Sequence, residues 1–174
     1  MMFLAGCSIG SASENEEIKT IRDVNAEEFT EYSGTYVGDN SRVSAILTKL
    51  AGGETVNHLD LSGENIHVTY GSKEGSLSQE KVDSFWYDGE DTNQNFYFNA
   101  MYLTILVPNA NEYIFDLQDS SLVITRDNMV DVLSKELTDF PDDEEIWNET
   151  VVTEFMKVNK DNIEEMANNY KEYF

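Results

Sequence analysis

The sequence predicts an α+β fold: a four-stranded antiparallel sheet made from two β-hairpins, with helices packed on one face and an extra C-terminal helix. The first observation is that apolar spacing changes between a helical period and a period of two, in the order helix, hairpin, helix, hairpin, helix. The second is composition: 40% of the 174 residues are hydrophobic, with nine Tyr, nine Phe and two Trp. That content suits one domain with a substantial core.

Two helices are expected before the first hairpin. Asn25 is a good N-cap with Glu28 three residues later, so "NAEEFTEY" can form a short helix. A longer helix follows, because four apolar residues share one helical face: Val43, Ile46, Leu47 and Leu50. One of three polar residues can cap its start, Asp39, Asn40 or Ser41, and Gly52-Gly53 ends it.

The stretch "HLDLSGENIHVTY" predicts the first hairpin. Leu59 and Leu61 alternate with polar residues, the same alternation continues from Ile66 to Tyr70, and "SGEN" reads as the turn. The later stretch "VDSFWYD" is expected to form a further short strand. Its aromatic residues could stack on cell-wall sugars, but aromatics at strand spacing more often belong to a core.

A second set of elements repeats the pattern. "NFYFNAMYLTILV" is apolar nearly all round, which predicts a helix covered on most sides and ended by Pro108. "EYIFDLQDSSLVITR" predicts the second hairpin, and "RDNMVDVLSKEL" returns to helical spacing with Thr125 or Asp127 near its cap. The repeated helix-plus-hairpin pattern suggests a loose duplication, and four antiparallel strands with helices on one face is the natural packing.

The C-terminal segment 141–174 predicts one or two more helices. Asp161 and Glu164 form a possible capping box. A stripe of four apolar residues should dock on the domain: Ile163, Met166, Tyr170 and Phe174.

Charge excludes some function classes. The chain carries 34 acidic and 11 basic residues, a formal net charge of −23. Such a surface repels nucleic-acid phosphates and anionic lipid headgroups, so we expect no nucleic-acid partner and no electrostatic membrane binding. High acidity more often reflects solubility than a site. No apolar run approaches the roughly 20 residues of a membrane-spanning helix.

The N-terminus carries a candidate lipid anchor. Leu4-Ala5-Gly6-Cys7 resembles a bacterial lipobox, in which the Cys thiol is joined to diacylglycerol after cleavage. Cys7 is the single cysteine, and the polar stretch "SIGSASENEEIK" that follows suits a tether. The basic head of an export signal is missing, which a start codon assigned too far downstream would explain. The alternative is a cytosolic protein with a chance match.

These observations divide the chain into four parts. Residues 1–7 are the expected remnant of a lipoprotein signal, and residues 8–23 a flexible polar tether. Residues 24–140 form the α+β domain, and residues 141–174 a C-terminal helical extension.

Three segments resemble a known family: "YVGDNSRVSAIL" (36–47), "NAMYLTILVPNANEYIF" (99–115) and "ITRDNM" (124–129). They are similar to the domain-of-unknown-function family DUF4825, often found in lipoproteins and membrane-tethered proteins of Gram-positive bacteria. The resemblance runs from about residue 30 to about residue 140. It implies an extracytoplasmic location on the cell membrane and a binding or sensing role, and it implies no activity.

The turn "YVGDNS" is the candidate binding segment. Its possible binding residues are Tyr36, Gly38, Asp39, Asn40 and Ser41. Gly38 permits unusual backbone angles, and the following helix directs free N–H groups toward this turn. The simpler interpretation is a turn followed by a helix cap.

The strongest candidate for a metal site is the set of side chains His58, Asp60 and His67. If Leu61 lies opposite Ile66, all three side chains share the outer face of the hairpin, and Asp60 lies roughly opposite His67. Two imidazoles and a carboxylate could bind zinc, but nothing fixes a fourth ligand, and strand pairing explains them as well. The acidic stretches 88–95 and 141–149 do not match a calcium loop.

The sequence therefore predicts a lipid-anchored extracytoplasmic domain that binds a protein or small-molecule ligand of the cell envelope, or acts as an accessory sensor. Its membrane contact is the lipid on Cys7. No catalysis, metal or cofactor is expected. The alternative is a cell-envelope hydrolase or metal-binding protein that uses the His58/Asp60/His67 face.

Overall fold

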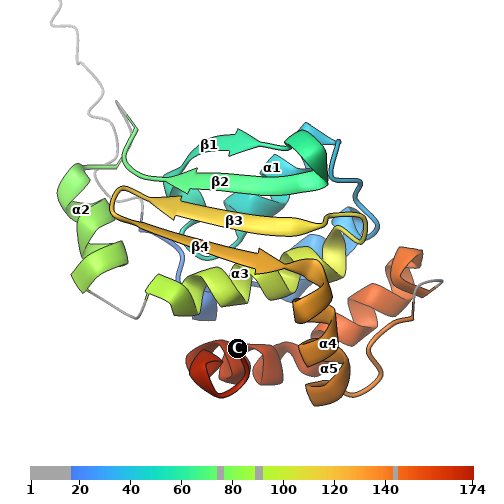
Figure 1. Cartoon of the computed structure of the whole chain (residues 1–174). Coiled ribbons are helices and arrows are strands. Elements are labelled where there is room, and N and C mark those ends of the chain that lie inside the picture. The colour runs from blue at the N-terminus through green and yellow to red at the C-terminus, as the bar shows by residue number, and fades with distance from the viewer. Residues whose placement is uncertain (1–16, 74–76, 89–91, 143–144) are drawn as a thin grey trace, which may run out of the picture.

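The structure is a computed structural model that describes residues 17–73, 77–88, 92–142 and 145–174. Its centre is a four-stranded sheet with the strand order β1-β2-β3-β4 (Figure 1). The strands are Val56–Asp60 (β1), Asn65–Tyr70 (β2), Glu112–Leu117 (β3) and Ser120–Thr125 (β4). The α+β class and the four strands are confirmed.

The expectation of an antiparallel sheet is wrong, because the sheet is mixed. β1 pairs antiparallel with β2, and β3 with β4, but the central strands β2 and β3 run parallel. The reason lies in the connection from Tyr70 to Glu112, which contains two helices, α2 (Gln79–Asp83) and α3 (Thr92–Leu106). A crossover of this kind returns the chain to the end of the sheet where β2 began, so β3 follows β2 in the same direction.

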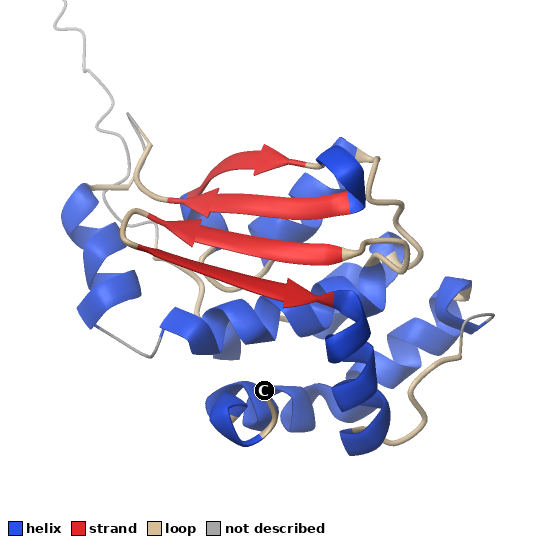
Figure 2. Ribbon diagram, in the orientation of Figure 1, coloured by secondary structure: helices blue, strands red, loops and turns tan. Residues whose placement is uncertain are grey.

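The helices cover one face of the sheet. In the orientation of Figure 1, α1 (Asn40–Lys49) and α3 lie behind the strands, and α4 (Arg126–Glu136) and α5 (Glu149–Asn168) lie beyond the β4 edge. Figure 2 shows the near face of the strands without helices over it. The alternating burial of β2 and β3 follows from this arrangement: every second residue is buried, among them Ile66, Val68, Tyr113 and Phe115.

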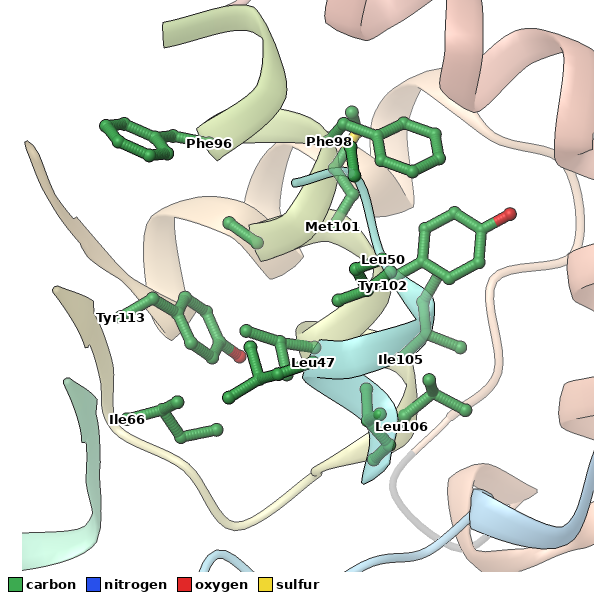
Figure 3. Close-up of a cluster of buried hydrophobic side chains, with 14 of the residues drawn as sticks. Leu47, Leu50, Ile66, Phe96, Phe98, Met101, Tyr102, Ile105, Leu106 and Tyr113 are labelled. Atoms are coloured by element: carbon green, nitrogen blue, oxygen red, sulfur yellow. The ribbon is translucent and has the colours of Figure 1, made fainter. Parts of the chain in front are cut away.

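The helix α3 forms the centre of the core. It carries a nearly continuous set of buried residues, and its side chains meet those of α1 and the sheet (Figure 3). Two buried polar residues on α3 form hydrogen bonds across this interface. The Asn99 amide donates to the Ala51 carbonyl at 2.9 Å, and Thr104 Oγ1 lies 3.0 Å from the Tyr113 hydroxyl. Burial raises the pKa of Tyr113 to about 12.

The segment 82–88 is helical, so the expected strand there is wrong. Its residues fall in α2 and in one turn of π-helix, Ser84–Asp88. Ser78 caps α2 by accepting a hydrogen bond from the Lys81 N–H. Trp86 is fully buried against Tyr70 and Phe96, whereas Tyr87 faces solvent. Core packing of Trp86 explains this aromatic cluster, as the simpler interpretation held.

The C-terminal segment contains one long helix, α5, capped by Asn148, whose side chain accepts from the Thr150 and Val151 N–H groups. Asp161 lies inside this helix, so the expected capping box there is wrong. The apolar stripe does dock on the domain: Ile163 and Met166 are buried. The rings of Tyr170 and Phe174 both stack on Tyr97 of α3, at 5.0 and 4.5 Å between centroids.

The last residues of the expected tether pack on the domain. Ile21 is buried in a 3-10 helix, Ile21–Asp23. The Lys19 carbonyl accepts from the Gly52 N–H, and the Lys19 N–H donates to the Glu54 carboxylate at 3.0 Å. The remaining part of the expected tether, 8–16, and Cys7 lie outside the described residues.

Candidate functional site

A pocket of about 650 Å³ lies at the carboxyl ends of β2 and β3. Because these two strands are parallel, their carboxyl ends lie side by side at the same end of the sheet, where α2 and the β3–β4 turn approach them (Figure 1). Ligands of open α/β sheets bind outside the carboxyl ends of parallel strands. The pocket at the carboxyl ends of β2 and β3 therefore lies where open α/β sheets commonly bind their ligands.

Many of the side chains that line the pocket are polar. β2 contributes Thr69, and the β3–β4 hairpin contributes Asp116, Gln118, Asp119 and the hydroxyls of Ser120 and Ser121. The α2 side adds Gln79, Asp83 and Tyr87. Among the described residues that line the pocket, none is Lys, Arg or His. The lining offers carboxylates, hydroxyls and amides, which suits a polar ligand without negative charge.

Two ionisable groups of the pocket are perturbed. The Ser121 hydroxyl and the His67 ring both hydrogen-bond the Asp116 carboxylate, and these contacts hold the pKa of Asp116 below its usual range. His67 Nε2 lies 2.6 Å from Asp116 Oδ2. The pKa of Tyr87 is raised, first by partial burial and then by the carboxylates of Asp119 and Asp83. The pocket therefore favours positive over negative charge.

Sequence reasoning missed this pocket. Its carboxylates come from α2 and from the second hairpin, in segments that gave no motif. The missing signal was the parallel pairing of β2 with β3, which the long helical connection between the hairpins could have indicated.

The predicted binding turn, residues 36–41, lies at the start of α1. Asp39 caps the helix: its Oδ1 accepts from the Arg42 N–H at 3.1 Å and from the Ser41 hydroxyl at 2.7 Å. These bonds hold the pKa of Asp39 below its usual range. The Val37 N–H donates to Asn109 Oδ1 at 2.9 Å, which ties the turn to the end of α3. The capping interpretation accounts for Asp39 and Ser41.

Tyr36 of the same turn is exposed and lies beside Trp147, with ring centroids 5.1 Å apart. Gly34 packs against the same indole: a Cβ at its position would lie 3.3 Å from the Trp147 ring. The Asn40 N–H donates to the Gly38 carbonyl at 3.1 Å, and Gly38 has open space around its Cβ position. A role of the turn in binding remains a prediction.

The structure puts His58, Asp60 and His67 on the helix-free face, with Asp60 opposite His67 in register. It does not bring the three side chains together around one point. The Asp60 carboxylate turns to Ser62, accepting from its N–H at 2.9 Å, whereas His67 turns to Asp116 on the other neighbouring strand. Hydrogen bonding to Ser62 lowers the pKa of Asp60.

In the described part of the chain, no group of three or more His, Cys, Asp or Glu side chains lies close enough to hold a metal ion. The acidic stretches 88–95 and 141–149 are each interrupted by residues outside that part. The described helices also include none long and apolar enough to cross a membrane.

The fold and this site are those of a small α+β domain with a polar pocket at the ends of two parallel strands. Comparison with known families matches residues 29–127 to a domain of unknown function, DUF4825. This match covers more than half of the chain, so the chain belongs to that family. No curated protein and no solved structure matches it.

Proposed function

We propose that this chain is a lipid-anchored binding domain on the extracytoplasmic face of the cell membrane, which acts as a receptor or accessory sensor without catalysis. Its ligand is a protein or a small molecule of the cell envelope. The anchor is Cys7, in the sequence Leu4-Ala5-Gly6-Cys7. Two acyl chains on one residue give the stable attachment that a single chain does not give.

The observation that carries the binding role is the pocket at the carboxyl ends of β2 and β3. It is about 650 Å³, a volume in the range of small-molecule sites, and its lining is rich in hydrogen-bonding groups. Because no group of three or more His, Cys, Asp or Glu among its described residues could hold a metal ion, a domain of this size gets more support as a binding module than as a metal-dependent enzyme.

The alternative is a cell-envelope hydrolase or metal-binding protein that uses His58, Asp60 and His67. It gets less support, because Asp60 and His67 are hydrogen-bonded to different partners. A metal assay separates the two functions. Stoichiometric zinc that is lost in His67→Ala would favour the alternative.

The binding role is tested by NMR on the ¹⁵N-labelled full chain, with size-separated fractions of a cell-envelope extract as the probe. We expect one fraction to shift the amides of Gly71, Gln118 and Asp119, which line the pocket. Ser120→Trp fills the pocket and should abolish these shifts. Ser134→Trp, on the exposed side of α4, is the matched control and should leave them unchanged.

Shifts that persist in Ser120→Trp would place the ligand elsewhere on the chain. The lipid anchor is an independent part of the proposal, with its own test. An in-frame upstream extension of the gene with basic and then apolar residues would support it, and an in-frame stop close to Met1 would count against it.

A further inference from the structure

We propose that the free edge of β4 binds an extended, basic segment of a partner polypeptide as a fifth strand of the sheet. β4 is a terminal strand, bonded to β3 on one side only. The β3–β4 hairpin is closed by two residues, with Leu117 paired to Ser120. In this geometry alternate residues bond across the hairpin, so the N–H and C=O groups of Ser121 and Val123 face away from β3.

These outward groups are not used elsewhere in the described chain. No loop, turn or cap bond among the described residues involves the backbone of Ser121 or Val123. The side chain of Val123 is 54% exposed. A row of unpaired backbone donors and acceptors is a template for an added strand.

The two edges of the sheet differ in protection. β1 has an irregular register between Val56 and His58 and carries Asp60, and both features discourage pairing with another strand. β4, with the sequence SSLVIT, has a continuous register, no charge and no proline. The sequence therefore disfavours pairing of an added strand with β1 but not with β4.

A groove runs beside the β4 edge and gives the added strand a place for its side chains. The groove has a volume of about 330 Å³ and contains Val123 and Ile124 of β4. Val132 of α4 and the stacked rings of Tyr97 and Phe174 form an apolar wall. Every second side chain of an added strand would point toward this wall.

Charge and space define the occupant. Among the described residues that line the groove, Asp131 is the single charged one, and its carboxylate already pairs with Lys135 at 2.6 Å. The whole chain carries a net charge of −23, so a segment with Lys or Arg is favoured over an acidic one. Figure 1 shows α4 and the C-terminal turn beyond β4. The sheet edge of a second copy would bring its own α4 and C-terminal turn up to these elements, which favours a single extended segment over a second copy.

The test uses the ¹⁵N-labelled full chain and the peptide acetyl-KTVTVTVTK-amide as the probe. We expect the peptide to slow hydrogen exchange of the Ser121 and Val123 amides by about tenfold or more, as new backbone hydrogen bonds require. The same peptide with alternate N-methylated residues keeps its side chains but loses one bonding edge, and it should give no protection. The version flanked by Glu should bind about tenfold more weakly.

Two variants of one residue localise the effect. Val123→Pro removes the outward N–H without removing a bond to β3, so it should abolish protection of Ser121. Val123→Thr keeps the N–H and the branched side chain, so it should retain the protection of the Ser121 amide. Unchanged amide shifts in β3 check that the proline variant is folded, and the N-methylated peptide gives an answer that does not depend on any variant.

Three results would overturn the proposal. They are protection that maps to β1 or to no strand, equal binding of the N-methylated peptide, and self-association of the chain through β4 in place of peptide binding.

Discussion

The left-handed turn at Gly52 should be one of the least replaceable backbone positions in the chain. Gly52 ends the α1 region with φ of 73°, a conformation that costs an L-residue about 1–2 kcal/mol. A Cβ at this position would lie 2.5 Å from Trp86 Cζ2 and 2.9 Å from its Cη2. Trp86 is fully buried and its indole N–H donates to Thr55 Oγ1 at 3.0 Å, so the ring cannot move away freely.

The expected cost of Gly52→Ala follows from these two effects. Backbone strain of about 1–2 kcal/mol adds to overpacking of about 1–3 kcal/mol. We expect the free energy of unfolding to fall by about 3 kcal/mol and Tm by roughly 6–12 °C. The matched control is Gly38→Ala at the other end of α1, where no atom lies within 4 Å of a Cβ. The control should change stability by less than about 1 kcal/mol.

The assay is urea and thermal unfolding followed by far-UV circular dichroism, which does not depend on the fluorescence of Trp86. An unfolding midpoint of Gly52→Ala within error of the parent chain would refute the reasoning. So would an equal loss of stability in Gly38→Ala.

Three further predictions concern the cap of α5, the core and the sheet face. Asn148→Ala removes the acceptor for two N–H groups in the first turn of α5 and should lower the unfolding free energy by about 1 kcal/mol, measured by urea unfolding; an unchanged midpoint would contradict the capping role. Asn99→Leu leaves a buried carbonyl and the Tyr70 hydroxyl without their donor and should cost about 2–3 kcal/mol in the same assay, and a fully stable variant would contradict it. The pKa of Asp116 is held below its usual range by Ser121 and His67, so its ionised form stabilises the fold above the unfolded-state pKa, and this contribution is lost as pH falls through the lower folded-state pKa. Asp116→Asn should therefore lose less stability than the parent chain between pH about 5 and about 2, and equal slopes of stability against pH would contradict this.

The elements could be predicted from the sequence wherever one pattern decided them. The face of Val43, Ile46 and Leu47 gives α1, and the all-round apolar stretch before Pro108 gives α3, because burial is the main determinant of both. The register of Asp60 with His67 also followed from the alternation of apolar residues.

The predictions failed where tertiary packing decides. The segment around Trp86 has strand-like composition, but a helical turn places the indole in the core and Tyr87 in solvent. Asp161 has the spacing of a cap, but the apolar face of α5 continues through it, so the helix does not stop there. Local patterns do not reveal such long-range contacts.

The pocket could not be predicted because it depends on the direction of β3 relative to β2. Asp116 and Thr69 are opposite each other only in the parallel pairing, and Asp83 approaches them only through the helical fold of α2. The sequence pointed instead to residues 36–41, where Asp39 serves as a helix cap.

The proposed location of the protein on the membrane is tested most directly by measuring the intact mass and the membrane fractionation of the chain from its native host. It should be expressed from its native upstream DNA, beside Cys7→Ala. The account predicts a membrane-bound protein whose mass begins at a diacylated Cys7, and a Cys7→Ala variant that leaves the membrane fraction. A soluble chain that retains Met1, and that Cys7→Ala leaves unchanged, would contradict it.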